Sequence, residues 1–504
     1  MENFLTALVA FLTDPVGIFY FMAALFGGLV FGSIPGLSTI TLAAIVLPFT
    51  ALMEPLHAIM VFAVMYVSGC YGGAVTAILF NIPGSPNNAP TVFDGYPMTL
   101  KGQSGKAIGA AIMCSAIGGL ASVILMMVAT GPLAEWALKA FGPPEVFSLI
   151  FFGLVIVGSV GATSLWKGLL SVSFGLMLAT IGVDPAVGET RFDFGSSFLM
   201  GGIGFVPLVL GFFAISEVMV QGHRIAAGMR LPPKIGIDFP SFREFWNLKF
   251  AMVRSIFLGF FAGILPGIGA ILAAFLSYSV AVRFSPHPER FGKGELEGVV
   301  ASETANNAAT GAAMIPLLAL GLPGGALTAV MMGVFEIHGL EPGPLVFATN
   351  LDLIWGIFIA MFLANIGIFA LGYFETKTIV HLLRIPFSLL GPGILLVSTI
   401  GAYALRNTLL DVWVMFIAGI AGYFLRRWQY SMAGIVIGAI LGKLGESAFV
   451  KTMQMLDYNF LGIFERPISA ALISLAVLSV VYGAYRSLRA PAPGSASAKT
   501  STLT

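Results

Sequence analysis

The sequence predicts an all-α protein that crosses a membrane many times, and three observations support this fold class. Of the 504 residues, 58% are hydrophobic and only 10% are charged, whereas soluble domains carry roughly 25% charged residues. Apolar runs of about 20 residues, enough to cross a bilayer core as a helix, recur along the chain. One Gly/Pro-interrupted pattern also occurs twice. We expect a polytopic transmembrane helix bundle of about 11–14 spans or re-entrant segments.

Uninterrupted apolar segments of spanning length occur in both halves. They centre near residues 18–34, 58–80, 107–130, 143–161, 165–183, 199–221, 252–267, 351–374, 387–404, 410–426, 431–446 and 467–486. Other apolar stretches contain Gly, Pro and polar residues, which is typical of broken helices or re-entrant hairpins. These are residues 36–52, 268–284, 301–321 and 326–340. Glu54 and His57 are expected to face water in a short loop.

The positions of Lys and Arg predict the orientation, because cytoplasmic loops are enriched in both. Residues 1–100 contain neither, whereas Arg224, Arg243 and Arg254 belong to a basic segment, 223–254. We therefore expect an extracytoplasmic N-terminus and a cytoplasmic C-terminus. The predicted units are a first transmembrane repeat (1–130), intervening helices with an extracytoplasmic loop (131–222), the basic cytoplasmic loop (223–254), a second repeat (255–374), C-terminal transmembrane helices (375–488) and a disordered tail (489–504).

An internal repeat is the most informative feature of the sequence. GLVFGSIPGLSTITLAA (28–44) and GFFAGILPGIGAILAAF (259–275) share the pattern Gly-x-x-x-Gly-x-x-Pro-Gly, and AILFNIPGS (77–85) resembles LLALGLPGG (317–325). A single Pro-Gly pair would indicate no more than a kink. Paired breaks in both halves, with opposite charge at their flanks, predict two inverted-topology repeats with Pro-Gly-broken helices. In transporters such a pattern indicates a binding site near the membrane midplane.

Polar residues cluster beside the breaks, and their burial costs about 1–3 kcal/mol each unless they find partners. The starts of broken helices offer free N–H groups and partial positive charge to an anion. The candidate carboxylate-binding residues are Gly36, Ser38, Thr39, Gly84, Ser85, Asn87, Asn88, Gly267, Asn306, Asn307, Gly324 and Gly325. The candidate ligands of a coupling cation are Asn87, Asn306 and Thr310. The alternative is that these polar residues join neighbouring helices by hydrogen bonds.

Ionisable residues in membrane segments are candidate proton carriers. Glu303 is the first such candidate, and Glu336 and His338 are weaker ones. Motifs for ATP hydrolysis or zinc-dependent catalysis are absent from the sequence, so we expect no enzyme, no catalytic residue, no metal centre and no cofactor. The net charge of +1 gives no basic surface for nucleic acid. Cys70 and Cys114 lie in apolar segments and are read as small core residues.

The same motifs carry a resemblance to a known family. GSIPGLSTITLAAIVLPFT (32–50), YGGAVTAILFNIPGSPNNAPTVFDGYP (71–97) and FGKGELEGVVASETANNAATGAAMIPLLALGLPGG (291–325) resemble the large membrane subunit of tripartite tricarboxylate transporters, the TctA-type family. GVDPAVGETRFDFG (182–195) is similar to that family's mid-chain loop and has the turn residues of an extramembrane hairpin. The resemblance covers most of the chain.

The resemblance implies a system of three parts in the bacterial inner membrane. A periplasmic solute-binding protein would capture citrate or a related carboxylate, and a small four-helix membrane subunit would accompany this large subunit. The Na⁺ or proton gradient, rather than ATP, would drive uptake. An anion channel and a non-transporting membrane scaffold remain alternatives.

Overall fold

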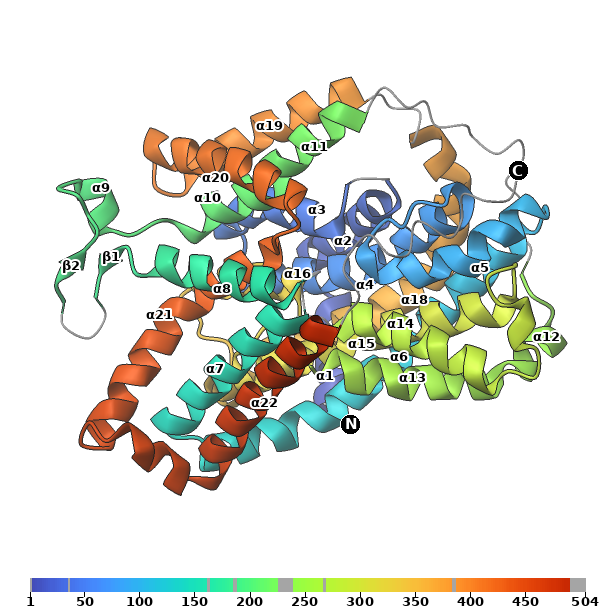
Figure 1. Cartoon of the computed structure of the whole chain (residues 1–504). Coiled ribbons are helices and arrows are strands. Elements are labelled where there is room, and N and C mark those ends of the chain that lie inside the picture. Colours follow the sequence, from blue (N-terminus) through green and yellow to red (C-terminus); the bar gives the residue numbers. More distant parts are fainter. Residues whose placement is uncertain are drawn as a thin grey trace.

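The computed structural model describes residues 2–34, 37–160, 164–184, 188–224, 239–265, 269–382 and 387–489. Within these ranges the chain is almost entirely helical, with one two-residue strand pair (Figure 1). Nine of the described helices are long and apolar enough to cross a membrane, and several shorter apolar helices accompany them. The predicted all-α polytopic bundle is confirmed.

The first half contains two long helices, α2 and α4, and each of them ends shortly before a Pro-Gly pair. An Asp14 side chain caps α2 by accepting hydrogen bonds from the backbone N–H groups of Val16 and Gly17. Helix α4 ends at Asn81, which adopts the left-handed conformation (φ 60°) and turns the chain into the Pro83-Gly84 break. The elements are α1 (Glu2–Leu12), α2 (Pro15–Ser33), α3 (Thr39–Val46), η1 (Leu47–Leu52), α4 (Pro55–Phe80), η2 (Pro86–Asn88), α5 (Ala89–Leu100) and α6 (Ser104–Ala140).

The second half repeats this order of elements. A helix, an interruption and a second helix are followed by a long buried helix, a second interruption, a short helix and a long helix. The long buried helix ends at Gly321 (φ 73°), the counterpart of Asn81. The elements are α12 (Phe242–Asn247), α13 (Lys249–Gly263), α14 (Gly269–Phe284), η4 (Pro288–Arg290), α15 (Leu296–Leu320), α16 (Ala326–Ile337), α17 (Pro344–Thr349) and α18 (Leu351–Leu382). The opposite direction of the two halves stays a prediction.

Two expectations about individual segments were wrong. Residues 301–321 are not an interrupted helix, because α15 continues through Pro316 to Leu320. His57 does not face water in a loop. It belongs to α4, is 7% exposed, and its Nε2 lies 2.5 Å from Asp14 Oδ2. Glu54, immediately before α4, is exposed as expected.

Helices α4 and α15 form the centre of the molecule. Nearly all of their residues are buried, and each packs against a long helix of the other half: α4 against α18, and α15 against α6. Glycines permit the close approach. A Cβ on Gly118 would lie 2.4 Å from the Thr304 carbonyl oxygen, and one on Gly259 would lie 2.5 Å from that of Ala305. The two halves thus share one core.

The remaining helices form two groups around this core. One consists of α7 (Pro143–Val160), α8 (Leu165–Ala179), α21 (Met432–Met455) and α22 (Pro467–Arg489). The other contains α10 (Phe205–Val209), the π-helical segment η3 (Leu210–Ile215), α11 (Ser216–Arg224), α19 (Phe387–Ala404) and α20 (Leu409–Arg427). Figure 1 shows both groups outside the central helices. Two short elements complete the chain, α9 (Ser197–Met200) and η5 (Phe460–Glu465).

The predicted mid-chain hairpin is present. Strands β1 (Gly182–Val183) and β2 (Thr190–Arg191) pair antiparallel and project from the helical body (Figure 1). Arg191 fixes the hairpin to α21, because its guanidinium lies 2.6 Å from Glu446 Oε1 and 3.2 Å from Asp184 Oδ2. These carboxylates raise the pKa of Arg191 above its usual value.

Candidate functional site

A cavity of about 940 Å³ lies where the helix interruptions of the first half meet those of the second half. Segments from both sides of the internal repeat contribute to its wall. From the first half these are residues 38–40 and 82–87, and from the second half residues 269–271 and 324–327. Small-molecule sites are typically concave and of about 300–1,000 Å³. The cavity is therefore large enough for a small organic ligand.

Four helix starts face this cavity. The lining includes the first residues of α3, of η2 leading into α5, of α14 and of α16. The amides at the start of η2 and α16 have no side-chain cap, because neither Ser85 nor Gly325 provides one. The starts of α3, α14 and α16 carry partial positive charge and N–H groups without an intrahelical partner. At α3, Ser38 Oγ accepts one of these N–H groups, that of Thr41, at 3.2 Å. The convergence of these helix starts favours the binding of an anion by backbone groups, which does not require a lysine at the helix tips.

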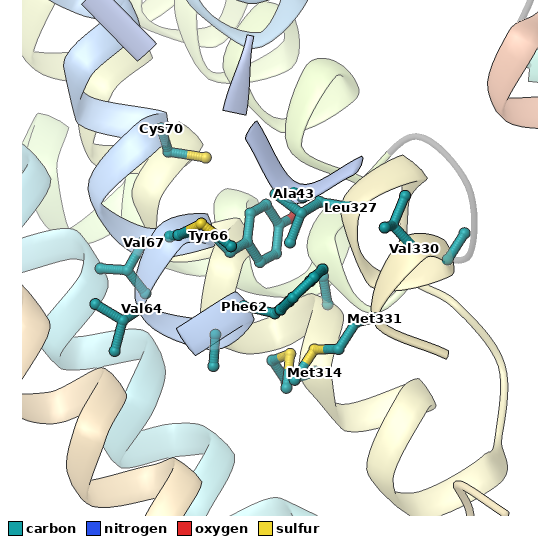
Figure 2. Packing of buried hydrophobic residues seen from close by; sticks show 14 of the residues in the cluster. Ala43, Phe62, Val64, Tyr66, Val67, Cys70, Met314, Leu327, Val330 and Met331 are labelled. Atoms are coloured by element: carbon teal, nitrogen blue, oxygen red, sulfur yellow. The ribbon is translucent and has the colours of Figure 1, made fainter. Parts of the chain in front are cut away.

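The inner wall of the cavity is apolar and continuous with the core. Tyr66 and Cys70 of α4 line it together with Leu327 of α16. Figure 2 shows the Phe62 and Tyr66 rings on α4 directed toward the α16 segment that carries Leu327 and Met331. All of these side chains are at least nine-tenths buried. This packing holds a helix interruption of the first half against a helix interruption of the second half.

The opposite wall is charged and comes from α11 and α20. Glu217 and Gln221 line the cavity from α11, and Arg426 and Arg427 from the end of α20. Arg426 forms an ion pair with Glu217 and also donates to the Phe212 carbonyl oxygen at 3.4 Å. Arg427 has no acidic partner within ion-pairing distance in the described ranges. Positive charge is therefore available at this wall.

A polar network lies behind the cavity, between α5, α6 and α15. Its centre is Glu303, whose side chain is fully buried. Glu303 Oε1 accepts hydrogen bonds from Asn88 Nδ2 (3.2 Å) and from the Thr91 hydroxyl, and Oε2 accepts from Ser115 Oγ (3.4 Å). Asn307 Nδ2 donates to Ser115 Oγ at 2.8 Å. The network joins the two halves through polar side chains.

The structure sorts the residues predicted for the site into three groups. The cavity is lined by Ser38, Thr39, Gly84, Ser85, Asn87, Gly324 and Gly325. Asn88, Glu303, Asn306, Asn307 and Thr310 are fully buried, and none of them is among the lining residues. Gly36 and Gly267 lie outside the described residues, as do Pro35 and Pro266.

The other candidate proton carriers lie at the far end of α16. Glu336 is exposed and His338 follows the helix, and neither lines the cavity.

The structure also defines the hydrogen-bond partners of the predicted cation ligands. Asn87 Nδ2 lies 3.8 Å from Cys70 Sγ, Asn306 Nδ2 lies 3.5 Å from the Cys70 carbonyl oxygen, and Thr310 Oγ1 donates to the Asn307 carbonyl oxygen at 2.8 Å.

Sequence reasoning missed the charged wall. Arg426 and Arg427 follow an apolar segment, a position typical of a cytoplasmic anchor, and Glu217 and Gln221 lie near the end of another apolar segment. The weak signal available was a glutamate inside the apolar segment 199–221, since ionisable groups in such segments are functional candidates. Its arginine partner is more than two hundred residues away, so local patterns could not identify the pair.

Comparison with known proteins agrees with this architecture. The model of the tripartite tricarboxylate transporter TctA family matches residues 18–437. A 52.8 kDa protein of Agrobacterium vitis from the TAR-I ttuC' 3' region, itself uncharacterized, is 35% identical over 479 residues and covers 94% of both chains. A second A. vitis protein, from the TAR-II ttuC' 3' region, is 36% identical over 231 residues, which are 46% of this chain and 96% of that protein. No solved structure matches.

The family match covers both repeats, every described helix start at the cavity and the charged wall. The A. vitis relative extends the similarity to nearly the full length. The chain belongs to the tripartite tricarboxylate transporter TctA family.

Proposed function

We propose that the chain is the translocating membrane subunit of a secondary transporter that imports tricarboxylates, such as citrate, or related carboxylates. The observation that carries the proposal is the convergence of four helix starts, two from each half, on one cavity. Helix starts bind carboxylate through backbone N–H groups and partial positive charge. Broken helices in paired repeats place such sites at the centre of a transporter.

The charged wall fits a substrate with more than one carboxylate. The helix starts would hold one carboxylate, and Arg427 on the opposite wall would attract another. An arginine can bind a carboxylate through two parallel hydrogen bonds. Arg426 is already paired with Glu217, so it shapes the wall and keeps the acidic side chain from repelling the substrate.

The positions of the arginines support inward release of the cargo. By the positive-inside rule, we assign the Arg426–Arg427 end of α20 to the cytoplasm. Because these residues line the cavity, we take the cavity to open toward the cytoplasm, as expected for a state that releases cargo inward. On the other side of the inner membrane, a periplasmic solute-binding protein would deliver the carboxylate, with a small four-helix membrane subunit as the second partner.

Energy for uptake would come from a Na⁺ or proton gradient. Each monovalent cation that crosses a potential of 100 mV contributes about 2.3 kcal/mol. Because a tricarboxylate is itself an anion, the membrane potential favours its uptake only when the coupled cations outnumber the negative charges of the substrate, and each net positive charge then contributes that amount.

Transport in proteoliposomes tests the proposal. Vesicles that contain the chain together with its small membrane subunit should take up labelled citrate saturably and in exchange for internal citrate. A channel would show no such counterflow. Asn87→Ala combined with Asn306→Ala should abolish uptake, because both amides lie at Cys70 between the cavity and the buried network.

The matched control is Asn247→Ala, which changes an exposed asparagine at the end of α12. It should transport at the wild-type rate. Equal expression and equal elution in gel filtration would show that all variants fold. Normal transport by the double variant would assign both asparagines to helix packing and remove them from the site.

A further inference from the structure

The buried carboxylate of Glu303 lacks a counter-charge. None of its oxygens lies within ion-pairing distance of a Lys, Arg or His side chain in the part of the chain that the structure describes. Its surroundings are neutral amides and hydroxyls. A carboxylate at membrane depth is costly unless a proton or a cation accompanies it. The structure therefore calls for a positive partner at this position.

Two further oxygens of the same helix face also lack partners. Asn306 and Asn307 follow Glu303 by three and four residues, a spacing that places all three side chains on one face of α15. Both asparagines are fully buried, and no hydrogen-bond donor among the described residues reaches Oδ1 of either. Their Nδ2 groups already donate, to the Cys70 carbonyl oxygen and to Ser115 Oγ. Unpaired buried acceptors are rare and call for an explanation.

The hydrogen bonds at Glu303 suit an ionised carboxylate, which is the form that binds a metal cation. Asn88 Nδ2 donates to Oε1, and the hydroxyls of Thr91 and Ser115 complete a set of three donors. Donors directed at a carboxylate stabilise its ionised form. One carboxylate with several neutral oxygens matches a hard cation of single charge, because hard cations select oxygen ligands.

We propose that Glu303, together with the side-chain oxygens of Asn306 and Asn307, binds a sodium ion in the core of the molecule. In its role as the coupling site, this assignment rests on the proposed function. The sequence pattern suggests Asn87, Asn306 and Thr310 as cation ligands, and of these the proposed site contains Asn306. In the structure Asn87 lines the cavity instead, and the Thr310 hydroxyl is engaged by its own helix.

One side chain connects this cation site to the carboxylate cavity. Ser85, on the cavity wall, donates through Oγ to Asn88 Oδ1 at 2.7 Å. The other end of the same amide donates to Glu303 Oε1 and, at 3.0 Å, to the Cys70 carbonyl oxygen. A substrate that engages Ser85 would reorient Asn88 and so change the ligands around the cation. This is a direct physical route for coupling.

Sodium binding by the purified chain tests the site without any substrate. The thermal unfolding temperature would be measured as NaCl replaces choline chloride at constant ionic strength, because a ligand that binds only the folded state stabilises it by RT ln(1 + [L]/Kd). Wild type should show a rise that follows the logarithm of the sodium concentration once this exceeds the dissociation constant, and KCl should not reproduce it. Glu303→Gln, which keeps the shape and removes the charge, should weaken the apparent sodium affinity at least about tenfold.

Two further variants keep the test decisive. Glu297→Gln, on the same helix but paired with Arg254 at 3.7 Å, should respond to sodium as wild type does. Asn307→Ala removes a proposed ligand while Glu303 remains, and it should also weaken sodium binding if Glu303→Gln does not fold. The proposal is overturned if sodium stabilises both Glu303→Gln and Asn307→Ala as it does wild type. It is also overturned if sodium does not change the unfolding temperature of wild type and Glu303→Gln differs from wild type only when the pH is lowered.

A citrate titration at saturating NaCl separates this assignment from the proposed function. If citrate fails to bind while sodium binding still depends on Glu303, the cation site stands and the substrate assignment fails. If citrate binds but sodium binding does not depend on Glu303, the substrate assignment stands and the cation site fails.

Discussion

At the scale of single residues, Gly73 has a defined role beside the cavity. It lies on α4, and a Cβ at this position would be 2.2 Å from Asn88 Oδ1 and 3.3 Å from the Ser85 backbone nitrogen. Gly73→Ala should therefore displace Asn88 from both Ser85 and Glu303. We expect a loss of citrate transport by tenfold or more, with a destabilisation of about 1–3 kcal/mol from overpacking. Proteoliposome uptake and thermal unfolding would measure the two effects.

The control for this prediction is Gly393→Ala in α19, where an added Cβ meets no atom of the described residues within 4 Å. It should leave transport unchanged and should not lower the unfolding temperature, since alanine favours a helix over glycine. Wild-type transport by Gly73→Ala would mean that the position of Asn88 is irrelevant to function.

The residues that the sequence could identify share a local signal. Ser38, Ser85 and Asn87 stand beside Pro-Gly pairs, and a break in an apolar helix can be recognised from the chain around it. Arg427 carries no such signal. Its contribution to the cavity depends on how α20 packs against α11 and the breaks, which is tertiary information.

At the scale of elements, α12 is attached to α6 by charge. Ser241 and Glu244 form a capping box at the start of α12, and Glu244 also pairs with Lys106 near the start of α6. The hydrogen bond from Lys106, followed by those from Ser241, lowers the pKa of Glu244 to about 2. This short helix precedes the second repeat, so the contact fixes where that repeat begins.

The docking of α12 should therefore depend on pH only in acid. A carboxylate whose pKa is lowered from about 4.5 on folding stabilises the docked state above pH 4.5, and this contribution is lost as the pH falls toward 2. Hydrogen–deuterium exchange, corrected for intrinsic rates, should show constant protection of residues 242–247 between pH 7 and about pH 4.5, and reduced protection near pH 2.5.

The matched variant is Glu244→Gln, which cannot titrate. Its protection should be lower than that of wild type at neutral pH and should not change on acidification. An acid-induced loss of protection in this variant equal to that of wild type would show that another group controls the docking.

The order of elements was largely predictable, and one exception is instructive. Broken helices at residues 36–52, 268–284 and 326–340 correspond to the short helices α3, α14 and α16. Residues 301–321 looked similar because Asn306, Asn307 and Pro316 lower their hydropathy. The helix nevertheless continues, because neighbouring helices surround α15 on every side and supply partners for its polar groups. Hydropathy alone does not distinguish a break from a buried polar helix.

At the scale of the whole molecule, the two halves meet along α4 and α15. Each of these helices ends in a left-handed residue followed by a break that lines the cavity, and α15 carries the proposed cation ligands. The repeat was visible in the sequence, but the contacts that it creates between the two halves were not. The polar residues of one half find their partners in the other, as Asn88 does with Glu303.

This arrangement predicts that Asn88 couples the two ligands of the proposed transporter. In wild type, saturating sodium should tighten citrate binding, and saturating citrate should tighten sodium binding by the same factor, typically about 5–150-fold, because linkage between two sites is reciprocal. Asn88→Ala removes the connection between Ser85 and Glu303, so both ligands should still bind while the factor falls toward one. Calorimetric titration of each ligand with and without the other would measure it, with Asn247→Ala as the control that keeps wild-type coupling. Coupling that persists in Asn88→Ala would mean that the helices themselves, rather than this side chain, transmit the effect.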